Sequence, residues 1–442
     1  MGTFVPGTPK EQQELLHAAG YRDFDDLFSV IPESVYLKSP LPLEEGKSEL
    51  ETEETISRIA EKNKVYRAIF RGAGAYDHYI PAIVKRVTTK ETFLTAYTPY
   101  QAEISQGVLQ SIFEYQTMIC ALTGMDVSNA SVYDGATATA EAAELCVERK
   151  KTRVLISASV APEVRKVVKT YAFGRDTDLQ EIPVKDGKTD LEALKAMVGD
   201  ETACVIIQQP NYYGLLENAD EIGEIAHSVK AKFIMNCNPI SLGVLKTPAE
   251  CGADLAVGEG QPLGMPLGFG GPYLGYMAST KALMRKLPGR IVGETVDTEG
   301  RRAYVLTLQA REQHIKRERA SSNICSNEAL CALTAAVYLA AMGPDGLKEA
   351  ATQCYSKAHY LQQGLEAAGL KKAYDGPFFH EFVTVSENSA QLLKKLEEAG
   401  ILGGLLLDET HILWCATEKN TKDQMDEVIC LAKELQKGGE KA

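Results

Sequence analysis

A loop rich in glycine and proline separates two apolar runs at residues 254–280, "DLAVGEGQPLGMPLGFGGPYLGYMAST". A dinucleotide-binding loop would need G-x-G-x-x-G at the start of a helix, where free amides bind a pyrophosphate. Pro262, Pro266 and Pro272 prevent an immediate helix, and Gly264 falls one place late. The loop contains no lysine and no histidine, so it is either a structural turn or a site that works without those groups.

Two further stretches put polar groups where an α/β sheet could use them. At residues 129–145, an Asp134-Gly135 turn precedes small residues, which suits an anion such as a phosphate at a helix start. A capped helix whose small residues pack against the sheet is the simpler explanation of that stretch. At residues 206–218, a strand ends in polar residues and a turn, and sites in α/β proteins form at the ends of parallel strands.

Weaker candidates are a lone histidine and a basic segment. His78 in "GAGAYDHYIP" could act as a general base, although a histidine beside aromatic residues is more often a hydrogen-bonded structural residue. In "REQHIKRERASSNIC", Arg317 or Arg319 with Ser321 and Ser322 could bind an anion, or the segment is a solvated helix that ends at a turn. No HExxH, nucleophile elbow or P-loop occurs.

The elements that must position these groups alternate along the chain. Short apolar strands are expected at residues 153–157, 204–210 and 232–237, separated by helices, which predicts a mostly parallel sheet with crossover helices. An amphipathic helix is expected from about residue 103, with Gly124 as its C-terminal stop. The predicted organisation is an arm at 1–65, a large α/β domain at 66–326 and a smaller α+β domain at 327–442.

Composition narrows the class of protein further. The 442 residues carry a formal net charge of -13, which opposes binding to nucleic acid and to anionic membranes. The ten cysteines are scattered, with no CxxC pair and no histidine at metal spacing, so reduced thiols and no metal site are expected. No signal peptide and no apolar run of spanning length is recognised, and we expect a soluble cytoplasmic protein.

Six motifs, taken together, are specific to one family. "GAGAYDHYIP", "TAYTPYQAEISQG", "NASVYDGATATAEA", "QQPNYYG", "VGEGQPLGMPLGFGGPYLG" and "REQHIKRERASSNIC" resemble, in this order, the P protein of the glycine cleavage system, a glycine dehydrogenase (decarboxylating). The similarity is greatest to the separate first subunit of its two-chain form. The resemblance implies a pyridoxal-phosphate-dependent transferase fold of the aspartate-aminotransferase type (fold type I), which agrees with the domain pattern.

In that family a lysine, in a His-Lys pair before a run of glycines, holds the cofactor as a Schiff base. No lysine lies between Lys246 and Lys281 here, and the matching positions are Gln261 and Pro262. The aspartate that keeps the pyridine nitrogen protonated in pyridoxal enzymes is matched by Met235, flanked by Asn236. We therefore expect no catalytic residue and no bound cofactor in this chain alone. The vestigial cofactor region comprises Asp134, Gly135, Ala136, Thr137 and Met235.

The resemblance also implies partners. A lysine-bearing second subunit would bind pyridoxal phosphate in an α2β2 heterotetramer, and the complex would decarboxylate glycine and transfer the aminomethyl group to the lipoyl arm of the H protein. The T and L proteins of the system would be indirect partners. Two segments are expected to complete the partner's site: Tyr97, Thr98 and Tyr100 in the first, and Ser321, Ser322 and Asn323 in the second.

Two alternatives remain open on the sequence. The chain could be a self-sufficient pyridoxal phosphate enzyme, an aminotransferase or desulfurase, with Lys246 as the nearest candidate lysine. It could also be a scaffolding subunit that contributes nothing to catalysis.

Overall fold

The computed structural model describes residues 7–39 and 41–439. Two compact units can be distinguished, Met1–Val65 and Tyr66–Ala442. The first unit contains α1 (Pro9–Ala18), α2 (Phe24–Leu27) and α3 (Glu49–Ala60). Capping boxes, in which Thr8 pairs with Glu11 and Ser48 with Glu51, begin α1 and α3. The predicted three-part division at residues 65 and 326 stays a prediction.

The second unit is built on a seven-stranded sheet of order β2-β10-β9-β8-β7-β3-β4. Its strands are β2 (Val127–Ser128), β3 (Arg153–Ser157), β4 (Asp178–Ile182), β7 (Thr202–Gln209), β8 (Lys232–Cys237), β9 (Leu255–Glu259) and β10 (Gly275–Ser279). Neighbours from β4 to β9 are parallel, and β10 is antiparallel to both β9 and β2. The apolar runs expected to form strands are β3, β7 and β8, so the prediction of a mostly parallel sheet is confirmed.

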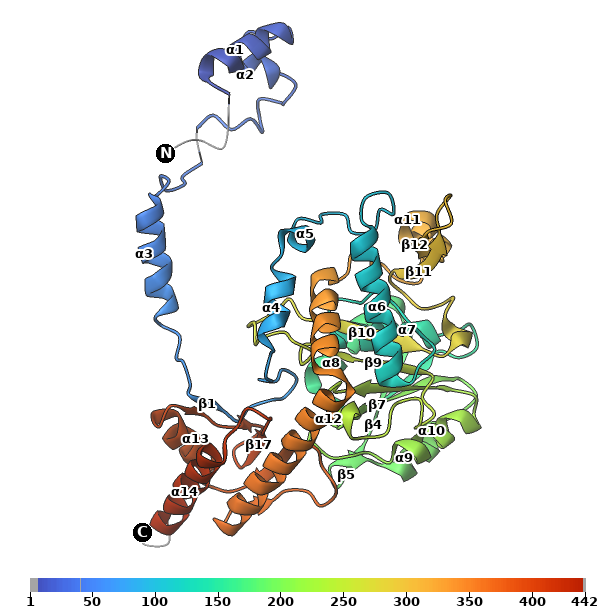
Figure 1. The fold of residues 1–442 in the computed structure, drawn as a ribbon, viewed down its shortest axis with the longest axis vertical. Coiled ribbons are helices and arrows are strands. Elements are labelled where there is room, and N and C mark those ends of the chain that lie inside the picture. Colours follow the sequence, from blue (N-terminus) through green and yellow to red (C-terminus); the bar gives the residue numbers. More distant parts are fainter. Residues whose placement is uncertain (1–6, 40, 440–442) are drawn as a thin grey trace. The chain divides into compact units, whose positions relative to one another are not determined.

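Helices cover both faces of this sheet (Figure 1). They are α6 (Gln106–Thr123), α7 (Gly135–Cys146), α8 (Pro162–Arg175), α9 (Leu191–Met197) and α10 (Ala219–Ser228). Because side chains alternate along a strand, Val205 and Ile207 pack with α6, α9 and α10, whereas Cys204 and Ile206 pack with α7 and α8. Gly124 ends α6 in the left-handed conformation, as the sequence predicts.

A long element, α12 (Ala329–Ala367), runs from the main sheet to the C-terminal part of the unit. It is two helices joined at a break, because Gly343 has φ 62° and Pro344 follows it. An 18-residue window of α12 is apolar enough to cross a membrane, contrary to the expectation that no such run exists. Residues 329–342 before the break fall short of the ~20 residues a spanning helix needs, and both halves contribute buried side chains to the core.

The C-terminal part is a four-stranded antiparallel sheet of order β13-β14-β17-β16 with its own core. Its elements are β13 (Lys371–Lys372), β14 (Glu381–Val385), α13 (Ser389–Glu398), β16 (Leu405–Leu406), β17 (His411–Cys415) and α14 (Lys422–Gly439). Trp414 is fully buried there and donates to Thr384 Oγ1 at 2.8 Å. Strand β15 (Ile401–Leu402) pairs with β1 (Ala68–Ile69) in a separate two-stranded sheet, which attaches the start of the unit to the C-terminal part.

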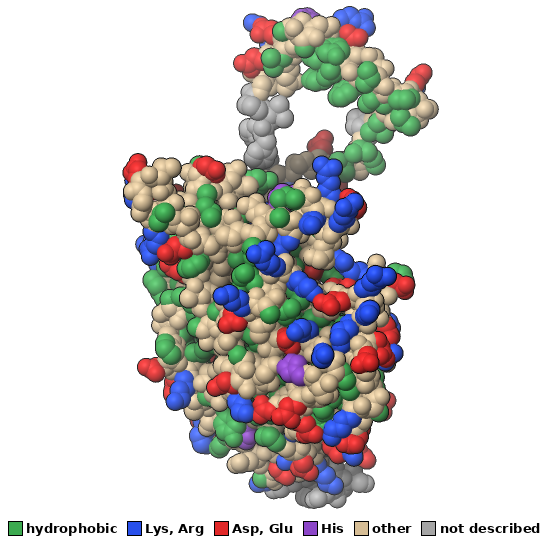
Figure 2. Space-filling view, turned by 90° about the vertical axis from the view of Figure 1, so that its right-hand side faces the viewer, with side chains coloured by type: hydrophobic (Ala, Val, Ile, Leu, Met, Phe, Trp, Pro, Cys, Tyr) green, Lys and Arg blue, Asp and Glu red, His purple; other side chains and the backbone are tan. Residues whose placement is uncertain are grey.

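The remaining elements are short connections. They are α4 (Ala82–Thr88), α5 (Glu91–Leu94), β5 (Val184–Lys185), β6 (Lys188–Thr189), β11 (Ile291–Val296), β12 (Arg302–Thr307) and α11 (Gln313–Lys316), with 3-10 turns at Ser241–Gly243, Lys281–Leu283, Gln309–Arg311 and Arg317–Arg319. Acidic and basic side chains are interspersed over the face of the second unit in Figure 2. A surface that binds nucleic acid typically carries an extended patch of basic side chains. The described residues of the face in Figure 2 show no such patch.

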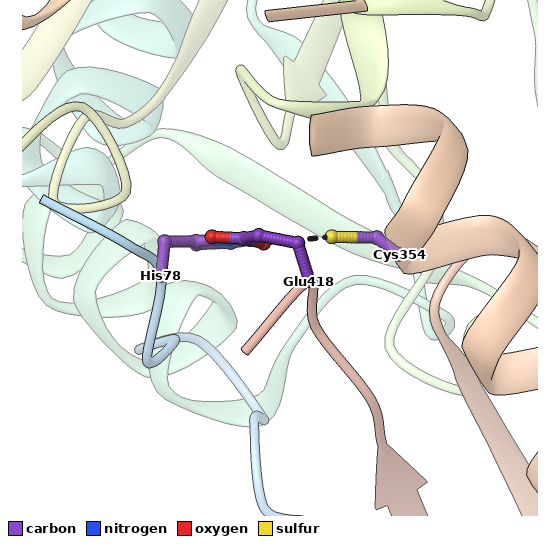
Figure 3. A group of neighbouring side chains, drawn as sticks. All are labelled: His78, Cys354 and Glu418. Carbon is purple, nitrogen blue, oxygen red and sulfur yellow. Dashed lines mark hydrogen bonds and ion pairs between the residues drawn. The ribbon is translucent and has the colours of Figure 1, made fainter. Parts of the chain in front are cut away.

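The carboxylate of Glu418, whose side chain is 11% exposed, joins three distant segments of the unit (Figure 3). Glu418 accepts hydrogen bonds from His78 Nδ1 at 2.8 Å, from the Cys354 thiol at 3.2 Å and from the Tyr79 amide at 2.5 Å. Burial alone would raise the pKa of Glu418, but these donors, His78 above all, lower it to about 2. His78, a candidate general base in the sequence, is therefore a hydrogen-bonded structural residue, 4% exposed.

The ligand-type atoms of these three residues lie within 4.8 Å of one another, a spacing that a metal ion could bridge. The Glu418 carboxylate already receives hydrogen bonds from both His78 and Cys354, which accounts for the cluster without an ion. The expectation of a chain without metal stays a prediction.

Replacing Glu418 by Gln tests how much these hydrogen bonds stabilise the fold. Above the ordinary pKa of 4.5 the carboxylate is ionised and its contribution is complete, and that contribution is lost as the pH falls toward about 2. Glu418→Gln is expected to lower the free energy of unfolding by about 1–3 kcal/mol at neutral pH, with a difference from wild type that shrinks below pH 4.5. Urea unfolding at several pH values measures it. The exposed Glu409→Gln is the control, and a difference independent of pH would contradict the assignment.

A second prediction concerns the close approach of α7 and β9. A Cβ at Gly135 would lie 2.5 Å from the Glu259 nitrogen and 2.8 Å from its Cα, both backbone atoms that cannot move away easily. Gly135→Ala should destabilise the protein by about 1–3 kcal/mol through overpacking. A Cβ at Gly174 in α8 meets no described atom within 4 Å, so Gly174→Ala should stabilise by about 0.5–1 kcal/mol. Equal unfolding midpoints for the two variants would refute this account.

Candidate functional site

A cavity of about 300 Å³ opens at the carboxyl ends of β7, β8 and β9. Gln208, Asn236 and Glu259 line it from the three strands, and the first residues of α7 line it from the side. Segment 73–76 and Glu381 of β14 complete the wall. This is the position where open α/β sheets bind ligands, and the structure brings two of the predicted stretches, 129–145 and 206–218, together there.

The start of α7 already holds an anionic group from the chain itself. Asp134 caps the helix by accepting from the Thr137 amide at 2.7 Å. The Gly135 amide donates to Glu259 Oε2 at 3.0 Å. The sequence suggested that the start of α7 could bind a phosphate. Its first amide, however, already donates to the carboxylate of Glu259.

Glu259 accepts two further backbone hydrogen bonds, from Gln261 N at 2.9 Å and Leu274 N at 3.0 Å. Burial raises the pKa of this carboxyl to about 7, the three amides oppose the rise, and Asp134 adds to it. The carboxyl therefore joins the two ends of the loop 260–274 to the start of α7. In the sequence, the available signal for this role was a single carboxylate at the end of an apolar strand.

Gln261, at the position matched to the cofactor lysine, is fully buried and is not among the residues that line the cavity. Its Oε1 accepts from Tyr76 N at 2.9 Å, and its Nε2 donates to Tyr76 O at 3.0 Å and to Met265 O at 2.8 Å. Pro262 beside it is also buried. The side-chain amide of Gln261 therefore holds the loop against segment 73–76. Neither Gln261 nor Pro262 has a nucleophilic side chain.

On β8 the structure places Asn236, and not Met235, in the cavity. Met235 is fully buried in the core on the opposite side of the strand, because consecutive side chains point to opposite faces. Asn236 lines the cavity and donates through Nδ2 to Thr139 Oγ1 at 3.1 Å. The expected vestigial position is therefore corrected by one residue, and the side chain there is an amide without charge.

The cavity is also lined by Glu381, a residue that the sequence did not point to. Glu381 accepts from Ala73 N at 2.7 Å and from the Tyr76 hydroxyl at 2.8 Å. Burial raises the pKa of Glu381 to about 7. A carboxylate inside the apolar run "FFHEFVTVS" was the only hint in the sequence, and nothing there linked it to residues 300 positions earlier.

The lining does not fit pyridoxal phosphate. None of the lining residues, all of them in the described part of the chain, is Lys, Arg or His, whereas four are carboxylates: Asp134, Glu163, Glu259 and Glu381. A phosphate dianion would face these groups at close range. Lys246, the alternative candidate lysine, is exposed, pairs with Asp220 at 2.7 Å and does not line the cavity.

The two segments predicted to complete a partner's site are joined through Arg290. Its guanidinium lies 4.5 Å from the centroid of the Tyr100 ring, pairs with Glu312 at 3.1 Å and donates to Cys325 O at 3.3 Å. The Tyr100 hydroxyl donates to Asn327 Oδ1. Tyr100 is thereby fixed to the segment that contains the predicted serines.

The other predicted residues differ in exposure. Tyr97 is 96% exposed, and Thr98, Ser321 and Asn323 are exposed as well. Ser322 is buried, and its hydroxyl accepts from Ile324 N at 3.1 Å and bonds the Glu141 carboxyl, so it is not presented outward. The candidate anion ligands are also solvated, because Arg317 and Arg319 are both exposed.

Comparisons with known proteins agree along the whole chain. A family model described as "Glycine cleavage system P-protein" matches residues 2–431. A protein of Carboxydothermus hydrogenoformans named probable glycine dehydrogenase (decarboxylating) subunit 1 is 50% identical over 435 residues, covering 96% of this chain and 98% of that protein. A crystal structure of glycine decarboxylase (P-protein) of the glycine cleavage system, in inhibitor-bound form, superposes with TM-score 0.92 at 42% identity, covering 98% and 100% of the two chains.

More distant structures share only the fold. A variant of C-DES with glycine covalently linked to its pyridoxal phosphate cofactor superposes with TM-score 0.61 at 14% identity, covering 85% of this chain and 98% of that one. The expected pyridoxal-phosphate-dependent fold type I is confirmed, and so is the predicted family. The match of the family model over nearly the full length, with the arrangement of sheet and cavity, shows that this chain belongs to the glycine cleavage system P-protein family.

Proposed function

We propose that this chain is the first, non-lysine subunit of a two-chain glycine dehydrogenase (decarboxylating). Its partner would be a second subunit that carries the cofactor lysine, in an α2β2 heterotetramer. Gln261 supports this most directly, since the residue matched to the lysine is buried and bonded at both ends of its amide. The ten free cysteines suit a reducing cytoplasm.

The complex would take glycine, release its carboxyl group as CO2 and transfer the aminomethyl carbon to one sulfur of the oxidised lipoyl arm of the H protein. The other lipoyl sulfur takes a proton, so the arm is reduced while the glycine carbon is oxidised. The T and L proteins would act on the product afterwards. Pyridoxal phosphate, bound by the partner, would supply the electron sink for the decarboxylation.

This chain would act by shaping the partner's site. Tyr97 and Thr98 lie on a loop that Pro99 stiffens, and Tyr100 at its end is clamped by Arg290 and Asn327. The clamp fixes one end of the loop while Tyr97 itself makes no hydrogen bond to a described residue and stays exposed. The Tyr97 hydroxyl can therefore bond to a neighbouring subunit. Because the loop that carries it is already fixed at one end, this costs little conformational entropy.

Co-expression with the lysine-bearing subunit tests the proposal. Glycine–bicarbonate exchange is expected from the pair and not from this chain alone. In the assembled pair, the double variant Tyr97→Ala, Thr98→Ala should lower exchange about tenfold or more, a loss of ~1.4 kcal/mol or more in transition-state stabilisation. Phe173→Ala, at an aromatic residue that is 89% exposed on α8, is the matched control.

Several outcomes would count against the proposal. Exchange by this chain alone would favour the self-sufficient enzyme. Unchanged exchange in the double variant, with the complex intact by gel filtration, would favour a subunit that only scaffolds. If both the double variant and Phe173→Ala failed to assemble with the partner, the exposed aromatic residues would act in docking and not in the site.

A further inference from the structure

The cavity at the ends of β7, β8 and β9 is lined by acidic side chains, as a site that binds a cation would be. Glu259 and Glu381 both line it, and Asp134 and Glu163 add two more carboxylates. Burying unpaired carboxylates costs free energy, which shows in the pKa of about 7 that both Glu259 and Glu381 have. A positive group placed between them would relieve that cost.

Both buried carboxylates keep acceptor capacity toward the cavity. A carboxylate offers about four lone-pair sites. Glu259 uses three, for the amides of Gly135, Gln261 and Leu274. Glu381 uses two, for the Ala73 amide and the Tyr76 hydroxyl. Each can therefore accept a further N–H donor without losing the contacts that hold its own segment.

An unpartnered amide oxygen points to the same kind of ligand. Asn236 is 7% exposed and lines the cavity. Its Nδ2 is bonded to Thr139, but its Oδ1 accepts no hydrogen bond from any described residue. Because this oxygen is open to the cavity and has no partner in the described part of the chain, it suits a ligand that donates a hydrogen bond.

We infer that this cavity binds a small organic cation, a compound with a primary ammonium group and no carboxylate, and that it excludes the dianionic cofactor of the fold. The ammonium would donate to Glu259, Glu381 and Asn236. The volume of about 300 Å³ and the rings of Tyr76, Tyr212 and Tyr273 in the lining exceed the needs of a bare metal ion and leave room for an organic part. The inference stands on this cavity alone and is independent of the proposed assembly.

Glycinamide and glycine form a matched pair of probes for the purified full-length chain. Both carry an ammonium group, but only glycine has a carboxylate, which would face the carboxylates of the cavity. Isothermal titration is expected to give saturable binding of glycinamide at one site, with glycine at least about tenfold weaker because like charges at close range are repelled. Pyridoxal phosphate should give no saturable binding.

Variants assign the binding to this cavity. Glu381→Gln and Glu259→Gln should each weaken glycinamide about tenfold, the effect of losing one charge-assisted hydrogen bond. Glu163→Gln, at an exposed residue of the rim, should weaken it less without affecting folding, and Glu224→Gln on the exposed face of α10 should leave it unchanged. Circular dichroism and unfolding midpoints check that each variant is folded.

Three results would overturn the inference. They are the absence of saturable glycinamide binding, binding of glycine or pyridoxal phosphate as tight as that of glycinamide, and binding that Glu163→Gln and Glu381→Gln leave unchanged. None of them bears on exchange activity in the assembled pair, so failure here and failure of the proposed function are distinguishable.

Discussion

The hydrogen bonds that Glu259 accepts hold the candidate site in its present form. One carboxyl receives the amides of Gly135, Gln261 and Leu274, and so joins the start of α7 to both ends of the glycine-rich loop. Hydrogen bonds to a charged group are worth about 1.5–3 kcal/mol each, and these three oppose the cost of burying the carboxyl. Burial still raises the pKa of Glu259 to about 7, above the ordinary 4.5, so its stabilisation is complete below 4.5 and declines as the pH rises through 7.

The hydrogen bonds to Glu259 also help to order the loop 260–274, which contains no lysine. The loop begins after Glu259 and is held near its start by Gln261, whose side-chain amide makes hydrogen bonds to both the N–H and the C=O of Tyr76. Tyr76 in turn donates to Glu381. Loop, segment 73–76 and β14 thus form one hydrogen-bonded wall, and the place of a covalent cofactor link is taken by amide contacts within the chain.

The sequence predicted much of this scaffold. Strands β3, β7 and β8 and the end of α6 at Gly124 follow from local rules of periodicity and backbone geometry. The position on β8 was assigned one residue early, and only the strand's alternation in the folded sheet shows that Asn236 faces the cavity.

Other parts of the site could not be predicted from local patterns. Glu381 meets Ala73 and Tyr76 across about 300 residues of sequence, a contact that only the packing of the C-terminal sheet creates. Ser322 looked like a group offered to a partner, yet its hydroxyl turns inward to Glu141. Burial and partner choice of single polar side chains are set by tertiary structure, and neither has a signature in spacing.

Under the proposed function, this chain has exchanged cofactor binding for an internal carboxylate and acts through a partner subunit. The most direct measurement is the stoichiometry of pyridoxal phosphate in the purified two-chain complex, with borohydride reduction and peptide mapping to locate the label. We expect one cofactor for each pair of unlike chains, with every labelled lysine in the partner. A cofactor on each chain, or a labelled lysine in this one, would contradict it.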